Sequence, residues 1–228
     1  TFEPIYLSIF LGSVKIALLT VLVSLLICYP AAFWVSRMSE PRKSFVLFLI
    51  TLPFFANLLV RIYAWLLLLR PSGFINMALE SLGLIAQPLD MLFSSFAVIV
   101  GMVYIFTPFM FLPIYANVEK LDFSLVRASQ DLGATPVQTF LRVILPLTVP
   151  GIAGGSIIVF IPALGNFIVP AFLGGSKVQM TGNLIERSFL QSRDWPFGAA
   201  LSLLIMGSVV IIVMFQVIRS TRQNRGAA

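Results

Sequence analysis

Residues 125–150 read LVRASQDLGATPVQTFLRVILPLTVP, a charged stretch that lies between two long apolar runs. A short helix that ends at Leu132 is predicted, with Ser124 as its N-cap, because one of its faces comprises Leu125, Ala128, Ser129 and Leu132 at i, i+3, i+4 and i+7 spacing. Gly133 follows where glycine commonly ends a helix, because glycine adopts left-handed backbone dihedrals at little cost. A lipid bilayer explains the apolar runs but not a well-capped polar segment, so the stretch predicts contact with a protein partner.

A second short helix is predicted directly after Gly133. Thr135, Pro136 and Gln138 have the spacing of a capping box with proline at the first helical position. Pro146 is expected to end this helix or to bend it into the next apolar run, because proline lacks a backbone N–H. The prediction is two helices joined at a glycine, and the apolar stripe of the second comprises Val137, Phe140, Leu141 and Ile144.

The composition predicts an integral membrane protein of the all-α class. Of the 228 residues, 59% are hydrophobic and 11% are charged, against about 25% charged residues in soluble domains. The mean hydropathy is +1.00. The chain has no histidine, which excludes a histidine-based metal site or proton relay, and no metal site is predicted. No basic run with interleaved aromatic residues stands in a polar segment, so nucleic acid is not an expected partner.

Five apolar runs are long enough to cross a bilayer as helices, since a span needs about 20 apolar residues. The run at 74–85 is too short and predicts an amphipathic helix. We expect one transmembrane domain over 1–228, with a polar segment at about 117–146 on one side and a loop at about 174–196 on the other. The five predicted spans are 5–35, 45–69, 92–115, 147–173 and 197–218.

Basic residues predict the orientation, because loops on the cytoplasmic side carry the excess of lysine and arginine. Nine of the fifteen fall on the side of the polar segment 117–146, four fall on the other side, and Lys15 and Arg61 lie within spans. The polar segment and the C-terminus are therefore expected in the cytoplasm. The nine are Arg37, Arg42, Lys43, Lys120, Arg127, Arg142, Arg219, Arg222 and Arg225, and the four are Arg70, Lys177, Arg187 and Arg193.

The polar segment resembles the cytoplasmic coupling loop of ABC importer permeases, whose motif is Glu-Ala-Ala-x3-Gly-x9-Ile-x-Leu-Pro. Gly133 stands at the glycine and Val143-Ile144-Leu145-Pro146 at the closing tetrad, with the spacing kept. The opening triplet departs from the motif, because Arg127-Ala128-Ser129 replaces Glu-Ala-Ala. An ordinary amphipathic hairpin at the membrane interface is the alternative. The resemblance implies that the residues which contact the ATPase are Arg127, Ala128, Asp131, Gly133, Ala134, Phe140, Leu145 and Pro146.

The same resemblance implies a type I importer permease fold in the bacterial inner membrane, with a sixth, N-terminal span that precedes this sequence. The implied partners are two ATPase subunits that bind ATP and magnesium, a second and related permease chain, and an extracytoplasmic solute-binding protein. This chain is expected to bind no cofactor. It is not expected to be an enzyme, because Gly174-Gly175 is not followed by the Lys-Ser/Thr of a phosphate-binding loop.

Three further segments resemble the spermidine/putrescine permease subfamily, which implies a polyamine or a related small organic cation as cargo. They are Arg61-Ile62-Tyr63-Ala64-Trp65, Pro108-Phe109-Met110 and the stretch 193–199. No acidic residue stands between Asp131 and Glu186, although a polycation favours anionic partners. Three explanations stay open: the second permease supplies the acids, aromatic residues replace them, or the cargo is a less cationic small solute.

The stretch 160–170 is a candidate lining of the transport path, because two prolines in a glycine-rich run can unwind a helix beside a cavity. A kinked structural helix is the alternative. Arg61 within a span predicts a cavity, an acidic partner or an interfacial position. Nearby aromatic residues suit either cation binding or packing. The candidate path residues are Arg61, Tyr63, Trp65, Tyr104, Phe160 and Asn166.

Two other functions are weighed against the importer. A secondary transporter or channel typically needs carboxylates within its spans, whereas the acidic residues here cluster outside them. An intramembrane enzyme needs a histidine, a metal-ligand cluster or an acidic pair within the spans, and the sequence offers none of these. An ATP-driven importer subunit is the function that the sequence favours.

Overall fold

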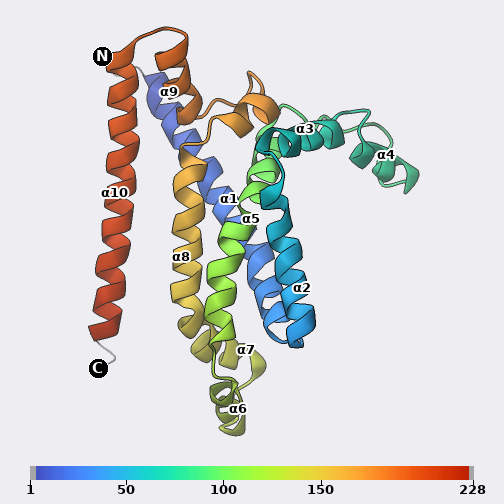
Figure 1. The fold of residues 1–228 in the computed structure, drawn as a ribbon, viewed down its shortest axis with the longest axis vertical. Helices are drawn as coiled ribbons and strands as arrows, with labels where there is room; N and C mark the ends of the chain where they lie inside the picture. Colours follow the sequence, from blue (N-terminus) through green and yellow to red (C-terminus); the bar gives the residue numbers. More distant parts are fainter. Residues whose placement is uncertain (1–3, 226–228) are drawn as a thin grey trace. The chain divides into compact units, whose positions relative to one another are not determined.

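A computed structural model describes residues 4–225 of the chain, and every regular element among them is helical, as predicted (Figure 1). The α-helices are α1 (Pro4–Ser36), α2 (Glu40–Thr51), α3 (Leu58–Leu69), α4 (Phe74–Ser81), α5 (Ser95–Glu119), α6 (Phe123–Asp131), α7 (Pro136–Thr139), α8 (Leu145–Leu164), α9 (Thr181–Leu190) and α10 (Trp195–Arg225). A 3-10 helix, η1 (Leu52–Phe55), and two π-helical turns, η2 (Phe140–Ile144) and η3 (Pro170–Gly174), complete the set.

Four helical segments of the described chain are long and apolar enough to cross a membrane: Ile5–Ser36, Leu58–Ser81, Ser95–Glu119 and Pro136–Leu164. The fifth predicted span, 197–218, falls within α10, whose described apolar part, Trp195–Ile211, is shorter. The predicted short helix at 74–85 is α4, which ends at Ser81.

The predicted second span, 45–69, is wrong in its bounds, because the chain leaves the α-helix in the middle of it. α2 ends at Thr51, η1 follows, and α3 begins only at Leu58. Pro53 supplies no backbone N–H for a continuing helix. The side-chain oxygen of Asn57 accepts the N–H of Leu59 at 2.8 Å and so caps a new helix. The average hydropathy of residues 45–69 does not indicate this interruption between α2 and α3.

The contacts divide the chain into two compact units, and the prediction of a single domain over 1–228 stays a prediction. One unit comprises residues 21–51 and 106–159. In it α8 packs closely on α5 through two glycines four residues apart. A Cβ on Gly151 would lie 2.9 Å from the backbone oxygen of Pro113, and one on Gly155 would lie 3.1 Å from that of Met110. Small residues at this spacing bring helix backbones together.

The other unit comprises residues 1–20, 52–105 and 160–228. Val98 and Met102 of α5 are fully buried in it, as are Val169 and Leu173. Gly101 leaves room for the Leu173 side chain. In the same unit α9 lies beside the beginning of α10, to which a short loop joins it (Figure 1).

Candidate functional site

The first candidate site is the coupling segment, residues 117–146, all of which lie in the unit formed by 21–51 and 106–159. Its first helix, α6, is capped by Asp122 and not by the predicted Ser124. The Asp122 carboxylate accepts the Ser124 backbone N–H at 2.8 Å. This hydrogen bond lowers the pKa of the Asp122 carboxyl below its ordinary value. The cap is therefore fully ionised above that ordinary pKa and is lost only as the pH falls through the lowered one.

Replacing Asp122 with alanine is expected to reduce transport per ATP hydrolysed about two- to fivefold, because the first turn of α6 loses its side-chain acceptor. Asp122→Asn should stay close to the wild type, since asparagine caps equally well. Ser124→Ala keeps the backbone N–H that Asp122 accepts and should have the smaller effect. The measurement is solute uptake against ATP hydrolysis in the reconstituted importer. A larger loss from Ser124→Ala than from Asp122→Ala would contradict this assignment of the cap.

The turn after α6 has the predicted left-handed glycine. Gly133 has φ +84°, a region that residues with a Cβ rarely adopt. The Gly133 N–H donates to the Gln130 carbonyl at 2.9 Å, and the Ala134 N–H donates to the Ser129 carbonyl at 3.0 Å. These bonds satisfy carbonyls that the end of a helix leaves free.

The predicted capping box of the second helix is confirmed. The Gln138 N–H donates to Thr135 Oγ1 at 3.3 Å, the Thr135 N–H donates to Gln138 Oε1 at 3.0 Å, and Pro136 is the first helical residue of α7. Pro146 does not end this helix, so that part of the expectation is wrong, while a bend at this point stays a prediction. The chain continues from α7 through η2 into α8, and the Leu145 N–H donates to the carbonyl of Phe140, five residues back. Pro146 is the second residue of α8, two positions after the π-helical turn ends at Ile144.

Two contacts hold the coupling segment together, and neither was predicted. Ser129 Oγ and Thr139 Oγ1 lie 3.0 Å apart and join α6 to α7 across the glycine turn. The guanidinium carbon of Arg37 lies 5.6 Å from the ring centre of Phe123, the first residue of α6. A cation over an aromatic face at this distance is attracted by the ring. The sequence near Thr139 and Arg37 does not predict these contacts, because each residue contacts a partner in another helix.

The predicted ATPase-contact residues are for the most part accessible. Arg127, Ala128, Asp131, Gly133, Phe140 and Pro146 are exposed, and Ala134 and Leu145 are half-buried. Phe140 also packs edge-on against Tyr29, with ring centres 6.0 Å apart. Large apolar side chains stand free beside them, with Leu132 88% and Val137 67% exposed. Such apolar side chains on a short, polar segment are typical of a surface that a partner covers.

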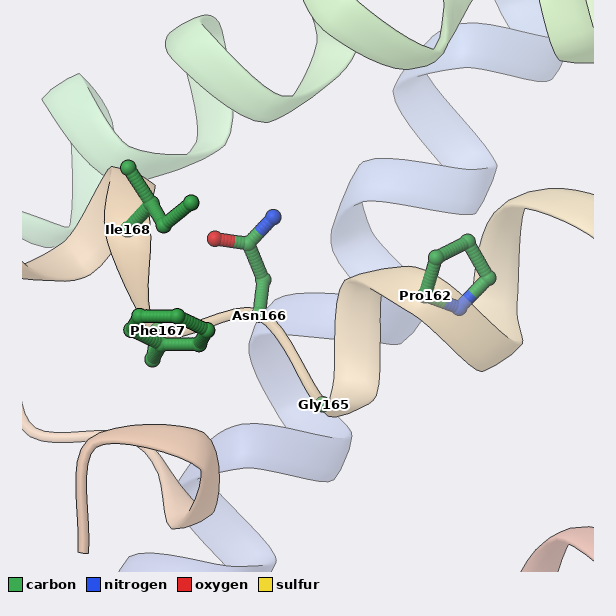
Figure 2. Close-up of a pocket in the computed structure, with 5 residues that line it drawn as sticks. All are labelled: Pro162, Gly165, Asn166, Phe167 and Ile168. Carbon is green, nitrogen blue, oxygen red and sulfur yellow. The ribbon is translucent and has the colours of Figure 1, made fainter. Parts of the chain in front are cut away.

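The second candidate site is an interruption at the end of α8, and all its residues lie in the unit that contains 160–228. The helix ends at Leu164, a short link passes through Asn166, and helical backbone resumes before η3 (Figure 2). The predicted fourth span, 147–173, is therefore not one continuous helix. Asn166 Oδ1 accepts the Val169 N–H at 2.9 Å and begins the new turn. The break falls between the two prolines, whereas Pro162 and Pro170 themselves lie in helical turns.

An open hollow of about 320 Å³ lies at this interruption. Figure 2 shows the Asn166 amide standing on the link between Pro162 on the preceding helix and Ile168 on the following one. An amide and the ends of helical segments present dipoles to this hollow, which suits a polar solute. The lining residues are Pro162, Gly165, Asn166, Phe167 and Ile168.

Helix α9 packs against the link that follows α8. Asn183 Nδ2 donates to the Phe167 carbonyl at 2.7 Å. A Cβ on Gly182 would lie 2.5 Å from the Gly165 oxygen, so the backbones of α9 and the link approach as closely as they can. The Thr181 N–H in turn donates to Ser13 Oγ of α1 at 2.8 Å. None of these three residues was predicted, because a sequence pattern does not place α9 against α8.

Of the six predicted path residues, Asn166 alone lines this hollow. Phe160 is buried. The aromatic residues contact one another: Tyr63 meets Phe172 and Trp65 meets Tyr104, each pair with ring centres 5.6 Å apart. Arg61 is half-buried, and its Nε has no hydrogen-bond partner within the described part of the chain. The other five are not among the residues that line this hollow, and all six stay predictions as cargo contacts.

Comparison with known proteins decides the family. Residues 24–223 match the family described as "Binding-protein-dependent transport system inner membrane component". The chain belongs to this family. It is thus a multi-pass subunit of the bacterial inner membrane, and its family serves ABC importers that work with a periplasmic binding protein. As predicted, the chain is a permease and not itself an enzyme.

Relatives of this permease cover most of its length. It is 43% identical over 92% of its residues to the "Spermidine/putrescine transport system permease protein PotB" of Salmonella typhimurium, of which it covers 74%. Identity to the PotB protein of Escherichia coli is 42%, over 92% of this chain and 78% of that one. The "Inner membrane ABC transporter permease protein YdcU" of Escherichia coli is 34% identical over 94% of this chain and 71% of that one.

Solved structures agree with the type I permease fold. A bacterial ABC transporter that imports the acidic polysaccharide alginate matches with a TM-score of 0.69, at 22% identity, over 93% of this permease and 79% of that chain. The same type of transporter in complex with an alginate-loaded periplasmic protein matches with a TM-score of 0.70 over 92% and 79%. At this level of identity the likeness concerns the fold and not the cargo.

Proposed function

We propose that this permease carries polyamines, such as spermidine or putrescine, or a closely related small organic cation across the inner membrane. The observation that carries the proposal is the 43% identity to a spermidine/putrescine permease over 92% of the chain. Another small solute is the second candidate, and it is supported by the absence of any acidic residue from 132 to 185, which includes the link at Asn166. A polycation in such a path needs other acceptors for its hydrogen bonds.

Backbone carbonyls and the Asn166 amide at the interruption of α8 are suitable acceptors for ammonium groups. Carboxylates from a second, related permease chain would supply the negative charge that this chain lacks. The extracytoplasmic binding protein delivers the solute to the outer face.

The coupling segment is proposed to receive the movement of two ATPase subunits, which bind ATP and magnesium while this chain binds no cofactor. The exposed Leu132 and Val137 support a protein partner at this position. The nine basic residues on that side support a cytoplasmic location for the segment and for the C-terminus. In this proposal the accessible surface from Arg127 to Pro146 docks on the ATPase and conveys the movement to α5 and α8.

The test is uptake into vesicles that contain the complete importer with its ATPase, second permease and binding protein. Labelled spermidine and putrescine should accumulate with ATP and should not accumulate without it. Accumulation should persist when ionophores collapse the ion gradients, which separates this mechanism from a secondary transporter. An uncharged sugar serves as the control solute. Uptake of neither polyamine by a complex whose ATPase responds to another solute would assign the cargo to that solute.

A further inference from the structure

A buried lysine outside the coupling segment binds two carboxylates. Lys43, in the first turn of α2, has a side chain that is 10% exposed. Its Nζ lies 2.8 Å from Glu40 Oε1 and 3.0 Å from Glu119 Oε1. A buried ammonium is costly unless it is paired, so these two contacts determine where the lysine can lie.

The two carboxylates do different things. Glu40 lies three residues before Lys43 on the same helix and is largely exposed. This ion pair therefore does not connect α2 to another helix. Glu119 is the last residue of α5, 76 residues away, so this pair joins α2 to the end of α5. The Tyr115 hydroxyl donates to the same Glu119 oxygen at 2.6 Å, and the Tyr115 ring stacks on Phe111. Glu119 is thus held by one donor from each of the two helices.

The end of α5 is also the beginning of the coupling segment. Only two residues, Lys120 and Leu121, separate Glu119 from Asp122, which caps α6. Arg37, which follows α1 and precedes α2, lies over Phe123 in the first turn of α6. The stretch from Arg37 to Lys43 therefore contacts the chain on both sides of the α5–α6 connection. All of these residues belong to the unit formed by 21–51 and 106–159.

We propose that Lys43, Glu119 and Tyr115, here called the Lys43 cluster, position α6 and transmit its movement to α2. Two residues are too few to absorb much displacement, so a push on α6 is passed to the end of α5. From there the ion pair passes the displacement to α2. The inference rests on the proposed docking of the ATPase at the coupling segment. In this proposal they are positioning residues, because they act through α6.

The charge state of the lysine is constant over the working pH range. The hydrogen bonds to Glu40 and then Glu119 raise the pKa of Lys43 above its ordinary value. A raised pKa means that the contribution of the ion pair is fully present below the ordinary pKa of lysine and is lost only as the pH rises beyond it. The Lys43 cluster therefore acts as a permanent ionic contact and not as a pH switch.

The test compares Glu119→Gln with Glu40→Gln in the reconstituted complete importer, with labelled spermidine uptake and ATP hydrolysis measured in the same vesicles. Both substitutions remove one carboxylate from the same Nζ, but only Glu119 joins two helices. Glu119→Gln should lower uptake per ATP about fivefold, within the range by which single positions change coupling, whereas Glu40→Gln should lie within about twofold of the wild type. Equal ratios in the two variants would overturn the inference.

A double-variant comparison separates transmission from a general loss of stability. Lys43→Met combined with Glu119→Gln should lower uptake per ATP no further than Glu119→Gln alone, because both act through one contact. If the importer with Glu119→Gln does not assemble, Tyr115→Phe is the variant that tests the proposal. It keeps the ring stack on Phe111 and removes only the hydroxyl that donates to Glu119. Tyr115→Phe should lower uptake per ATP about twofold, and an unchanged ratio would count against the proposal. Uptake by the wild-type complex tests the proposed function separately.

Discussion

A Gly133→Val permease is expected to assemble and to hydrolyse ATP in the importer while transport per ATP falls about tenfold. The cause is the backbone, because a Cβ at this position would meet no atom within 4 Å. The φ of +84° lies where a side chain costs roughly 1–2 kcal/mol, and more for a β-branched residue. About 1.4 kcal/mol changes the ratio of two conformations tenfold. Valine would therefore shift the turn to other conformations and change the direction of α6.

Gly83→Val is the matched control for this prediction. Gly83 has φ +68°, and a Cβ there would likewise meet no atom within 4 Å, but this glycine follows α4 and lies outside the coupling segment. The thermal stability of the two variant complexes should fall by similar amounts. Uptake per ATP should fall for Gly133→Val alone. A Gly133→Val importer that transports with wild-type efficiency would contradict a role for the left-handed turn in coupling.

The second large effect is expected at Gly182, where the obstacle is a collision. A valine Cβ there would lie 2.5 Å from the Gly165 oxygen and 2.8 Å from the Asn166 oxygen. Backbone atoms cannot rotate away as a side chain can, so α9 must move off the link, at roughly 1–3 kcal/mol for overpacking. The hydrogen bond from Asn183 to Phe167 is broken with it. Uptake should fall at least about tenfold, together with the melting temperature of the purified complex.

Gly154→Ala serves as the control for Gly182→Val, because a Cβ on Gly154 of α8 would meet no atom within 4 Å. Its uptake and melting temperature should stay close to those of the wild type. Binding of labelled spermidine to the Gly182→Val complex, measured apart from uptake, shows whether the hollow at Asn166 is affected. Unchanged uptake in Gly182→Val would mean that α9 does not hold the interruption of α8 in place.

Local chemistry explains which parts of the coupling segment could be predicted. The left-handed glycine and the Thr135 capping box each depend on residues within four positions, and both are confirmed. The N-cap of α6 is Asp122, two residues before the predicted Ser124, and local chemistry does not distinguish them because both residue types are good caps. Pro146 does not end the helix, because the π-helical turn before it carries the backbone hydrogen bonds on to Leu145.

The remaining features depend on contacts between distant positions. No periodicity indicates that Lys43 meets Glu119, or that Gly182 of α9 lies against Gly165. The sequence did predict unwinding in the stretch 160–170, and it attributed this unwinding to Pro162 and Pro170. The observed break lies between these two prolines, which are themselves in helical turns. The helix breaks near Pro53 and after Leu164 both fall inside predicted spans. Hydropathy does not indicate them, because it measures solvent preference and not backbone continuity.

Asn166, in the link after α8, and Asn183 of α9 have a consequence for where helical backbone can be interrupted. Helices normally end where solvent can take over the free backbone groups, which confines their ends to wet surroundings. Here the Val169 N–H and the Phe167 carbonyl are bonded by Asn166 and Asn183 instead. The protein thereby supplies from its own side chains the hydrogen bonds that water would otherwise make, so these backbone groups do not depend on solvent.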